Sequence, residues 1–572
     1  MPLTLTSASV SHWSVRKIAV VGPGIVGMPM AALLADARIR EGSEAPARVV
    51  VVQRDSPSSG WKVGAINAGR SPIGGVEPDL DRLVADAVRA GILSATHEYD
   101  ELSDADVILV SVQTDKDGER PDYGPLFDAL NHVATALTRR PMGNVPLVVF
   151  ESTLAPSSMA TVIRELFARH GLEEGRDVLL GNSPNRVMPG RLVERVAASD
   201  KVVAGLHPAT PGLIRRLYAR IVTRGVLHET NSLTAEVVKT LENAYRDVRI
   251  AYAAEVARHC DRHGIDFFAL RDLVNARAGQ ADSASTDPHV VPSGGLLVPM
   301  LGVGGHCLPK DGVLLWWRAR EAGHSTERSL ILEARTLNDA APKETLALAE
   351  RALGSFSGRR LALLGAAYRG NSEDTRNSPT LALARLLRER GIAFTIHDPY
   401  VKTADANLRQ AGMLESFTQV LGEAVRDADV LVLCCPHRVY ADQLSELIAC
   451  APRARALVDA AHLVAASAAA EHGLAYAGIG RGSRAPSSSL VEATFHGYQS
   501  VERGVANEVA GLVEFLNARY AEGEFNRVRF SEVQRIAATC PTGCSIVAPG
   551  SAPDAHAAEF DSRLVARALE RA

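Results

Sequence analysis

One loop, Gly302–Asp311, places a single thiol among groups that could activate it. Cys307 stands there beside His306, Lys310 and Asp311, which can favour a thiolate and position a water molecule. The glycines of this loop let its backbone approach a ligand closely. A buried structural cysteine fits poorly in such a polar, glycine-rich stretch, so we expect Cys307 to be a nucleophile.

Lys239 and Asn243 are a second candidate pair. They lie four residues apart, so on a helix they share one face. A cation and an amide together can stabilise an alkoxide or oxyanion formed during hydride transfer. The same spacing fits a solvated helix face, and taken alone it favours that interpretation.

A GxGxxG pattern formed by Gly22, Gly24 and Gly27 follows the apolar run Lys17–Val21. The glycines allow a tight turn and let a pyrophosphate reach the N-terminus of the next helix. Because a strand, a helix and a second strand surround the pattern, it predicts a dinucleotide site.

The acidic residue typical of such a site is displaced. The second strand ends in Val52-Gln53-Arg54-Asp55, so Gln53 stands where the acid is expected and Asp55 comes two residues later. An arginine here could also meet a 2′-phosphate, which leaves NAD and NADP both open.

Cys540 and Cys544 form a CxxxC without a companion pair, and we expect no metal site there.

The elements that must position these residues follow a regular order. Short apolar runs alternate with amphipathic stretches up to residue 230 and again from residue 359 to 482, which is typical of parallel, doubly wound α/β sheets. Between them, Asn231 to about His259 predicts one long helix with an apolar stripe, and residues 278–298 predict a loop. We expect four parts: residues 1–230, 231–345, 346–483 and an extension, 484–572.

Composition narrows the function classes. The chain has 572 residues, a net charge of −4 and no apolar run near the ~18 residues of a membrane span. These features argue against a nucleic-acid binder and against a membrane protein. The first residues show no secretory signal, and seven cysteines without framework spacing favour the reducing cytoplasm.

Taken in order, the motifs resemble the UDP-glucose/GDP-mannose dehydrogenase family over about residues 16–483. The resemblance rests on the motifs above and on further ones along the chain: Val107–Thr114 with Pro121-Asp122, Glu151-Ser-Thr153, Ser183-Pro184 with Pro189-Gly190, Leu364–Arg369, Asp374–Pro379, Asp398-Pro399 and Tyr476–Gly480. It implies two Rossmann-like sheet domains joined by a central helical domain that forms a homodimer through the long helix.

The resemblance implies a four-electron oxidation of a nucleotide-sugar C6 hydroxymethyl group to a carboxylate with two NAD⁺. Lys239 and Asn243 would hold the C6 oxygen, and Cys307 would carry a thiohemiacetal and then a thioester. Asp311 would orient or deprotonate the water that hydrolyses the thioester, with Thr153 nearby. The cofactor residues would be Gly22, Gly24, Ile25, Val26, Gly27, Asp55 and Thr114. The substrate residues would be Asn185, Gly304, Gly305, Arg369 and Arg376.

The motif GVGGHC resembles that of family members acting on UDP-N-acetylhexosamines more than that of UDP-glucose or GDP-mannose enzymes. It therefore favours UDP-N-acetylglucosamine or UDP-N-acetylmannosamine as the substrate. The chain also departs from the family pattern. Asn185 stands where a glutamate normally follows Ser-Pro, Arg369 replaces a lysine, Asp459–His462 replaces a DGRN-like turn, and residues 484–572 match nothing in the family.

Two other functions remain open at this point. A two-electron β-hydroxyacid dehydrogenase would not need Cys307 or the second α/β series. A non-catalytic nucleotide-sugar-binding protein would suit Asn185 and the displaced acid, but not the intact set Lys239, Asn243, Cys307 and Asp311. We expect the extension to be dispensable for chemistry, the alternative being that Gly504–Tyr520 packs on the core and stabilises it.

Overall fold

The computed structural model describes residues 13–74, 77–141, 145–188, 190–278, 295–541, 543–550 and 562–570. Pro189 and most of the expected loop 278–298 lie outside the described residues. The chain divides into two compact units, each built from separate stretches of sequence. The first unit holds residues 1–242, 313–324 and 509–545, and the second holds residues 243–312, 325–508 and 546–572.

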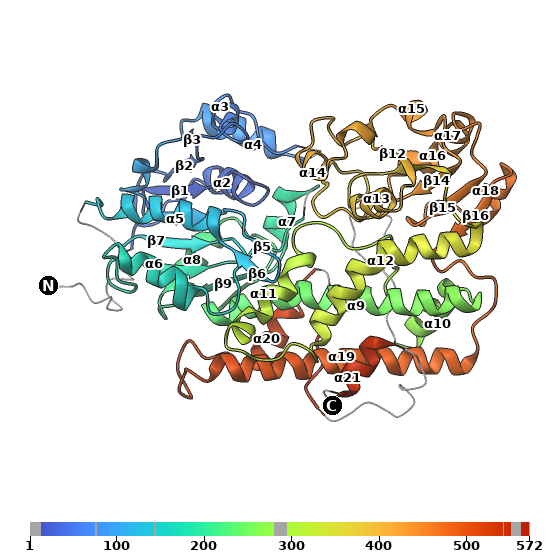
Figure 1. Cartoon of the computed structure of the whole chain (residues 1–572). Helices are drawn as coiled ribbons and strands as arrows, with labels where there is room; N and C mark the ends of the chain where they lie inside the picture. The colour runs from blue at the N-terminus through green and yellow to red at the C-terminus, as the bar shows by residue number, and fades with distance from the viewer. Residues whose placement is uncertain are drawn as a thin grey trace. The chain divides into compact units, whose positions relative to one another are not determined.

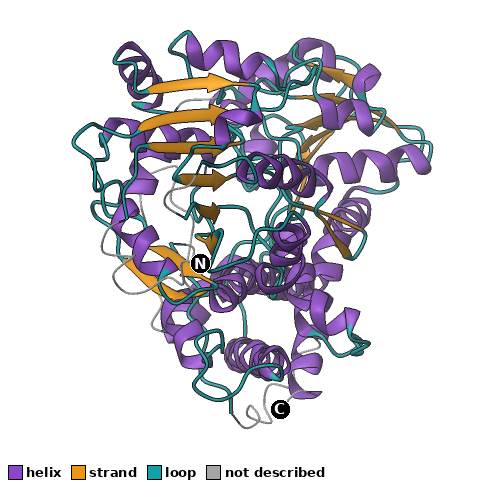
Figure 2. Cartoon of the chain, turned by 90° about the vertical axis from the view of Figure 1, so that its left-hand side faces the viewer, coloured by secondary structure: helices purple, strands orange, loops and turns teal. Residues whose placement is uncertain are grey.

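An eight-stranded sheet forms the centre of the first unit, in the order β10-β9-β8-β7-β4-β1-β2-β3, and Figure 2 shows these strands as a stack of arrows. All neighbouring pairs are parallel except β8 and β9. The strands are β1 (Lys17–Val21), β2 (Arg48–Val52), β3 (Leu93–Thr96), β4 (Val107–Val110), β7 (Leu147–Phe150), β8 (Leu179–Asn182), β9 (Lys201–Gly205) and β10 (Leu227–Asn231).

Both faces of this sheet are apolar, because successive side chains along a strand point to opposite sides. Ile18 and Val20 join one buried cluster, and Ala19 and Val21 join the other. Helices cover each face, as Figure 1 shows. The first cluster includes α2 (Gly27–Asp36), α4 (Leu80–Arg89) and α8 (Thr210–Tyr218); the second includes η1 (Tyr99–Leu102), α5 (Gly124–Leu137), the π-helical turn η2 (Met159–Ile163) and α6 (Arg164–Arg169).

The remaining elements of the first unit are short. The strands β5 (Asp115–Asp117) and β6 (Arg120–Asp122) pair as an antiparallel hairpin. The helices are α3 (Trp61–Asn67), α7 (Leu192–Ala198) and α20 (Phe530–Ala537).

The second unit contains a six-stranded, fully parallel sheet in the order β13-β12-β11-β14-β15-β16. Its strands are β11 (Arg360–Leu364), β12 (Ala393–His397), β13 (Phe417–Thr418), β14 (Val430–Leu433), β15 (Ala456–Asp459) and β16 (Ala475–Gly478). Its helices are α13 (Pro379–Glu389), α14 (Ala406–Gln410), η3 (Leu414–Ser416), α15 (Leu421–Val425), α16 (Arg438–Asp442), α17 (Leu444–Ala449) and α18 (Ala466–Glu471). The two sheets and the helices between them in sequence confirm the predicted fold class.

Among the described residues between the two sheets in sequence are four helices: α9 (Ser232–His263), α10 (Phe267–Arg277), α11 (Leu308–Glu321) and α12 (Leu330–Leu353). The long helix was expected to end near His259 and continues one turn further. Because α9 has no break, Lys239 and Asn243 stand one turn apart on the same face.

The extension folds as the 30-residue helix α19 (Ser488–Asn517), then α20, then α21 (Arg563–Glu570). In the second unit α19 covers the apolar stripe of α9. Tyr245 donates to Glu502, Tyr252 donates to the Thr494 carbonyl at 2.7 Å, and both tyrosines are buried. The stripe therefore has a partner surface within its own chain, which removes the physical reason for expecting a homodimer through it; the homodimer itself stays a prediction.

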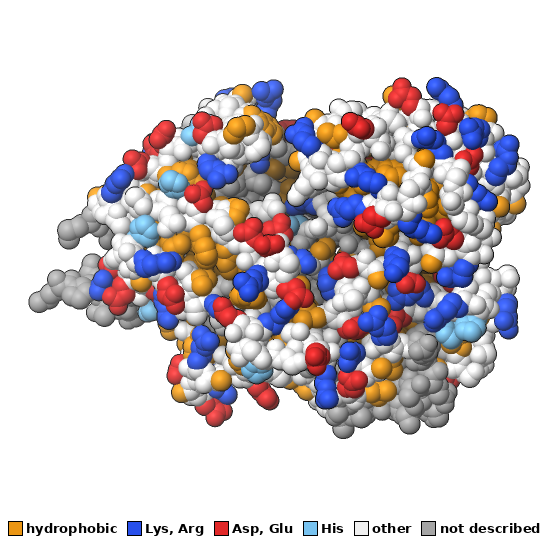
Figure 3. Space-filling view, in the orientation of Figure 1, with side chains coloured by type: hydrophobic (Ala, Val, Ile, Leu, Met, Phe, Trp, Pro, Cys, Tyr) orange, Lys and Arg blue, Asp and Glu red, His pale blue; other side chains and the backbone are white. Residues whose placement is uncertain are grey.

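The surface carries both signs of charge. Figure 3 shows acidic and basic side chains interspersed over the face in view, as the small net charge suggests. Within the described ranges, no helix has the length and apolar character needed to cross a membrane. Cys260, Cys307, Cys434, Cys435 and Cys450 are free thiols.

Candidate active site

The glycine turn after β1 combines a tight backbone with an open side. Gly22 has φ +91°, and a Cβ there would lie 2.9 Å from the Ser111 carbonyl oxygen. A Cβ on Gly27 would lie 2.2 Å from the Gly22 carbonyl oxygen, so neither position tolerates a side chain. A Cβ on Gly24, by contrast, would meet no described atom within 4 Å. This open space next to the N-terminus of α2, with Ile25 and Val26 half-buried in the same turn, suits a dinucleotide pyrophosphate.

At the end of β2, Gln53 and Asp55 differ in their surroundings. The Gln53 amide donates to Ser59 at 2.9 Å, whereas Asp55 is exposed. Arg54, between them, forms an exposed ion pair with Asp128 at 3.2 Å.

Two predicted residues, Thr114 and Thr153, come together after strands β4 and β7. The Thr114 hydroxyl donates to the Thr153 carbonyl at 2.7 Å. The pair lies where parallel strands end, the edge at which open α/β sheets bind ligands.

Glu236, which is not among the predicted site residues, fixes the segment after Thr153. Its buried carboxylate accepts the backbone N–H groups of Ser157 at 2.7 Å and Met159 at 2.8 Å. Burial raises the pKa of Glu236 to about 8, although these hydrogen bonds act to lower it. Glu236 is three residues before Lys239 on α9, so its hydrogen bonds tie the helix that carries Lys239 to this loop. In the sequence, the only sign of this role is that Glu236 lies in the first turns of the helix.

Asn185 lies beside a buried charge cluster. Its amide contacts the Glu151 carboxylate at 3.5 Å, and its side-chain oxygen accepts the Val187 N–H at 2.9 Å. Glu151 also accepts from Lys201 at 2.7 Å and from Tyr218. Burial lowers the pKa of Lys201 while the charge of Glu151 raises it. An amide at position 185 therefore avoids placing a second carboxylate against Glu151.

In the second unit, Cys307 is exposed at the start of α11. Its carbonyl accepts the N–H groups of Lys310 at 3.2 Å and Asp311 at 3.0 Å, so the thiol stands at the positive end of the helix. The pKa of Arg376 is raised, mainly by its hydrogen bond to Asp374 and in smaller part by the charge of Cys307. The Arg376 carbonyl also accepts the Gly305 N–H at 2.8 Å, which holds the backbone of Arg376 against the loop that carries Cys307.

Asp311 is fully buried and held from two sides. Asn243 donates to one carboxylate oxygen at 2.6 Å, and the buried Lys310 ammonium donates to the other at 2.6 Å. The structure therefore brings together two predicted catalytic residues, Asn243 and Asp311, and shows how the carboxylate orients the amide.

Gly304 and Gly305 have a structural requirement that the sequence did not reveal. A Cβ on Gly304 would lie 2.4 Å from the Tyr368 Cβ, and one on Gly305, where φ is +84°, would lie 2.8 Å from the Tyr368 ring. Asn377 also donates to the Gly305 carbonyl at 2.9 Å. These glycines are needed for packing against their own chain, whether or not they also meet a substrate.

The two predicted substrate arginines lie in the loop between β11 and α13. Arg376 forms a forked pair with Asp374, with contacts of 2.9 and 2.6 Å, and Arg369 is half-buried. The fork holds the Arg376 guanidinium in a fixed orientation near Cys307.

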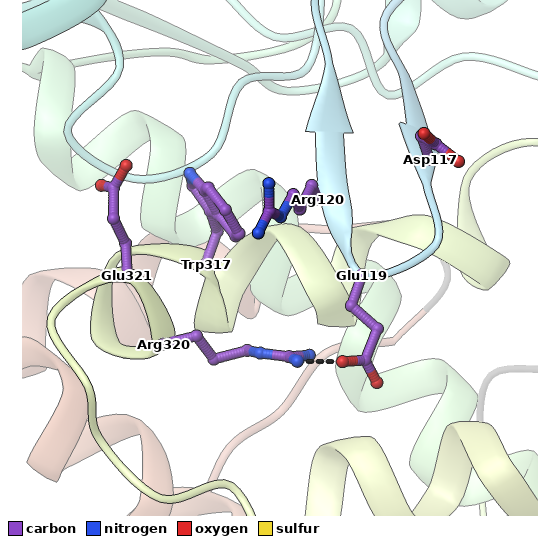
Figure 4. A pocket seen from close by; sticks show the side chains of 6 residues that line it. All are labelled: Asp117, Glu119, Arg120, Trp317, Arg320 and Glu321. Carbon is purple, nitrogen blue, oxygen red and sulfur yellow. Dashed lines mark hydrogen bonds and ion pairs between the residues drawn. The ribbon is translucent and has the colours of Figure 1, made fainter.

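A surface hollow of about 850 Å³ lies in the first unit between the β5–β6 hairpin and α11. Figure 4 shows Trp317 and Arg120 in its wall and an ion pair between Arg320 and Glu119. It contains none of the predicted site residues, and five of its six lining side chains are charged. The glycine turn and the Cys307 loop, each within its own unit, stay the predicted sites of cofactor binding and of the nucleophile.

Three family models match successive parts of the chain. Residues 16–222 match the NAD binding domain of the UDP-glucose/GDP-mannose dehydrogenase family, residues 233–340 its central domain and residues 362–466 its UDP binding domain. The chain belongs to this family.

Named relatives agree with this assignment. The chain is 32% identical over 470 residues to the UDP-N-acetyl-D-mannosamine dehydrogenase of Pyrococcus horikoshii, covering 82% of this chain and 99% of the relative. It is 31% identical over 434 residues, 74% of this chain and 92% of the relative, to the NDP-N-acetyl-D-galactosaminuronic acid dehydrogenase of Ralstonia nicotianae. The crystal structure of the NDP-N-acetyl-D-galactosaminuronic acid dehydrogenase from Methanosarcina mazei superimposes with a TM-score of 0.67 at 30% identity, covering 82% and 96% of the two chains.

The protein is therefore an NAD-dependent nucleotide-sugar dehydrogenase. The glycine turn lies in the NAD binding domain, and Lys239, Asn243, Cys307 and Asp311 lie in the central domain. Arg369 and Arg376 lie in the UDP binding domain. The roles of these individual residues remain predictions.

Proposed function

We propose that the protein oxidises the C6 hydroxymethyl group of a UDP-N-acetylhexosamine to a carboxylate. UDP-N-acetylmannosamine and UDP-N-acetylglucosamine are the favoured substrates. One alcohol, two NAD⁺ and one water give one carboxylate, two NADH and three protons. The wording GVGGHC at 302–307 supports this choice, as do relatives whose names specify N-acetylated sugars.

The observation that carries the proposal is the hydrogen bond between Asn243 and Asp311. Asp311 follows Cys307 by four residues in the sequence, so this contact lies next to the predicted nucleophile. The 2.6 Å hydrogen bond holds the amide in one orientation, and the exposed thiol stands one helical turn from the carboxylate. A carbonyl bound at Cys307 could then have its oxygen stabilised by preorganised donors.

The proposed sequence of steps uses the chain's own groups as follows. Bound NAD⁺ supplies the hydride acceptor for both oxidations. Lys239 and Asn243 donate to the C6 oxygen while the hydroxyl loses its proton to water. The Cys307 thiolate then bonds to the aldehyde carbon, giving a thiohemiacetal whose oxidation leaves a thioester. Water attacks the thioester, the carbon–sulfur bond breaks, and the thiol is restored.

Hydrolysis is the step most affected by Asn185. An amide cannot deprotonate water, and Asp311 is already paired with Lys310. We therefore expect acyl-enzyme to accumulate on Cys307, visible by intact-protein mass spectrometry after mixing with the sugar nucleotide and NAD⁺. In Asn185→Glu the new carboxylate would face Glu151, which raises the pKa of one of the two and makes it a better base near neutral pH. Hydrolysis should then be about 10²–10⁴-fold faster; no adduct in the parent enzyme and no gain in the variant would refute this step.

The test of the function itself is an assay of NAD⁺ reduction across UDP- and GDP-sugars, with NADH counted per product. Two NADH per uronate, with the highest kcat/KM for a UDP-N-acetylhexosamine, is the expected result. A clear preference for UDP-glucose or GDP-mannose would replace the proposed substrate. One NADH per product would contradict the four-electron reaction, and no turnover of any sugar would indicate a binding protein.

A further inference from the structure

Arg186, the residue after Asn185, is almost entirely buried and joins three parts of the first unit. Its side chain is 2% exposed and pairs with Glu242, which is 1% exposed, on α9. It also donates to the Thr539 hydroxyl at 2.9 Å, the Ile536 carbonyl at 3.1 Å and the Asp200 carbonyl at 3.3 Å. Two of these four partners belong to the C-terminal extension.

Each of these partners is needed for a physical reason. A buried guanidinium is costly unless its charge is paired and its N–H groups are hydrogen-bonded. Glu242 supplies the opposite charge, but one carboxylate cannot satisfy the whole guanidinium. The end of α20 supplies the rest, because a helix C-terminus presents carbonyl groups and favours a cation. Thr539 completes this end, since its hydroxyl donates to Ile536 at 2.7 Å while accepting from Arg186.

The extension is itself fixed along the last strand of the sheet. Asn231, at the end of β10, donates to the carbonyls of Phe525 at 2.9 Å and Arg527 at 3.1 Å. Val533 and Ile536 of α20 are fully buried. The segment therefore offers Arg186 a rigid set of acceptors.

We propose that α20 and Thr539 position the substrate side of the first sheet through Arg186. Holding Arg186 fixes the segment 183–188, and with it the Asn185 amide beside Glu151. The same guanidinium forms an ion pair with Glu242 of α9, one turn beyond Lys239. The extension is thus a positioning element for two predicted site residues, and the sequence-based expectation that it is dispensable for chemistry would be wrong. This inference rests on the proposed function.

The test compares Thr539→Val with Thr539→Ser. Valine has nearly the same shape but removes the oxygen that Arg186 and Ile536 share, whereas serine keeps it. Losing a partner of a charged donor is worth about a ten-fold effect. We expect Thr539→Val to raise the KM for the sugar nucleotide about ten-fold with little change in the KM for NAD⁺ or in the fraction of folded enzyme, and Thr539→Ser to restore the parent value.

Hydrogen exchange of segment 183–188 in the ligand-free enzyme separates this proposal from the proposed function. Faster exchange in Thr539→Val than in Thr539→Ser is expected even if the sugar panel yields no turnover. An unchanged sugar-nucleotide KM in Thr539→Val would overturn the proposal, as would an equal loss in both KM values and the folded fraction. For an enzyme that turns over no sugar, unchanged exchange would overturn it.

Discussion

The first turn of each large sheet begins with a glycine, but the two turns are completed differently. After β1, Gly22 leads within five residues into α2, and the space at Gly24 is open among the described residues. After β11, Gly365 has φ +103°, and fourteen residues pass before α13 begins at Pro379.

The acidic residue of the second strand explains part of the contrast. Asp398, just after β12, is buried and accepts the N–H groups of Ala366 at 2.7 Å and Ala367 at 2.9 Å. It also accepts from His437 at 3.0 Å. In the first sheet the corresponding position is Gln53, and the acid, Asp55, is exposed.

The same sheet architecture can therefore leave its glycine turn open for a cofactor or close it with its own side chains. Where the turn is closed, the long loop that follows it carries the two predicted substrate residues, Arg369 and Arg376. This agrees with the match of the first sheet to an NAD binding domain and of the second to a UDP binding domain.

The largest expected effect separates chemistry from cofactor binding. Cys307→Ser should lower uronate formation by roughly 10⁴-fold or more, because a hydroxyl is a far weaker nucleophile here. The first oxidation could continue slowly and release aldehyde, and NAD⁺ binding measured by calorimetry should be unchanged because it belongs to the first sheet. Wild-type rates of acid formation would remove Cys307 from the mechanism.

Removing residues 485–572 should destabilise the first unit and α9 more than the second sheet. The truncation would uncover Tyr245 and Tyr252 and leave the buried Arg186 without two partners. We expect loss of soluble, active enzyme, measured by yield, thermal unfolding and turnover. Tyr252→Phe, which removes only the hydrogen bond to Thr494, should cost about 1 kcal/mol. A truncated chain with full activity would restore the view that the extension is dispensable.

Asp398→Asn and Asp55→Asn should differ in their effect on unfolding. The pKa of Asp398 is lowered: burial raises it, but the hydrogen bond from His437 and backbone N–H groups outweigh that. We expect Asp398→Asn to cost about 2 kcal/mol, as a charge-assisted network is lost, and Asp55→Asn to stay within about 0.5 kcal/mol.

The pH dependence follows from the lowered pKa of Asp398. Its contribution to stability is present above the usual aspartate pKa, about 3.9, and is lost as pH falls through the lower folded value. Chemical denaturation between pH 7 and pH 3 should show a steeper acid-side loss for the parent than for Asp398→Asn. Parallel curves would show that the network does not stabilise the sheet.

A last pair of variants tests the open turn. Gly24→Val should leave unfolding almost unchanged but weaken NAD⁺ binding about 10–100-fold, since its side chain would occupy the space next to α2. Gly365→Ala should do the reverse, because its Cβ would lie 2.3 Å from the Cys435 Cβ. Thermal unfolding and cofactor titration of both variants decide the matter, and equal loss of stability in the two would contradict the contrast.

Much of the sheet scheme could be predicted from residue pattern. β1 occurs at the predicted residues, because buried parallel strands read as continuous apolar runs. The residue pattern does not predict β10, because its sequence, LHETN, is polar and half-buried at the edge of the sheet. Most of the helical pattern at Gly504–Tyr520 falls on α19, which runs from Ser488 to Asn517. Gly497 disfavours a helix in isolation, but it packs where a Cβ would lie 2.5 Å from the Tyr252 hydroxyl.

The sequence alone determined the fold class, the family and the candidate chemistry, because strand patterns, the glycine turn and the Cys307 loop are local features of neighbouring residues. Only the tertiary structure decided which residues hold those candidates in place. The contacts of Arg186 with α20, of Asp311 with Asn243 and of Tyr368 with Gly304 each join segments more than sixty residues apart. Local spacing carries no information about such pairs, since burial and charge compensation select them only after the chain has folded.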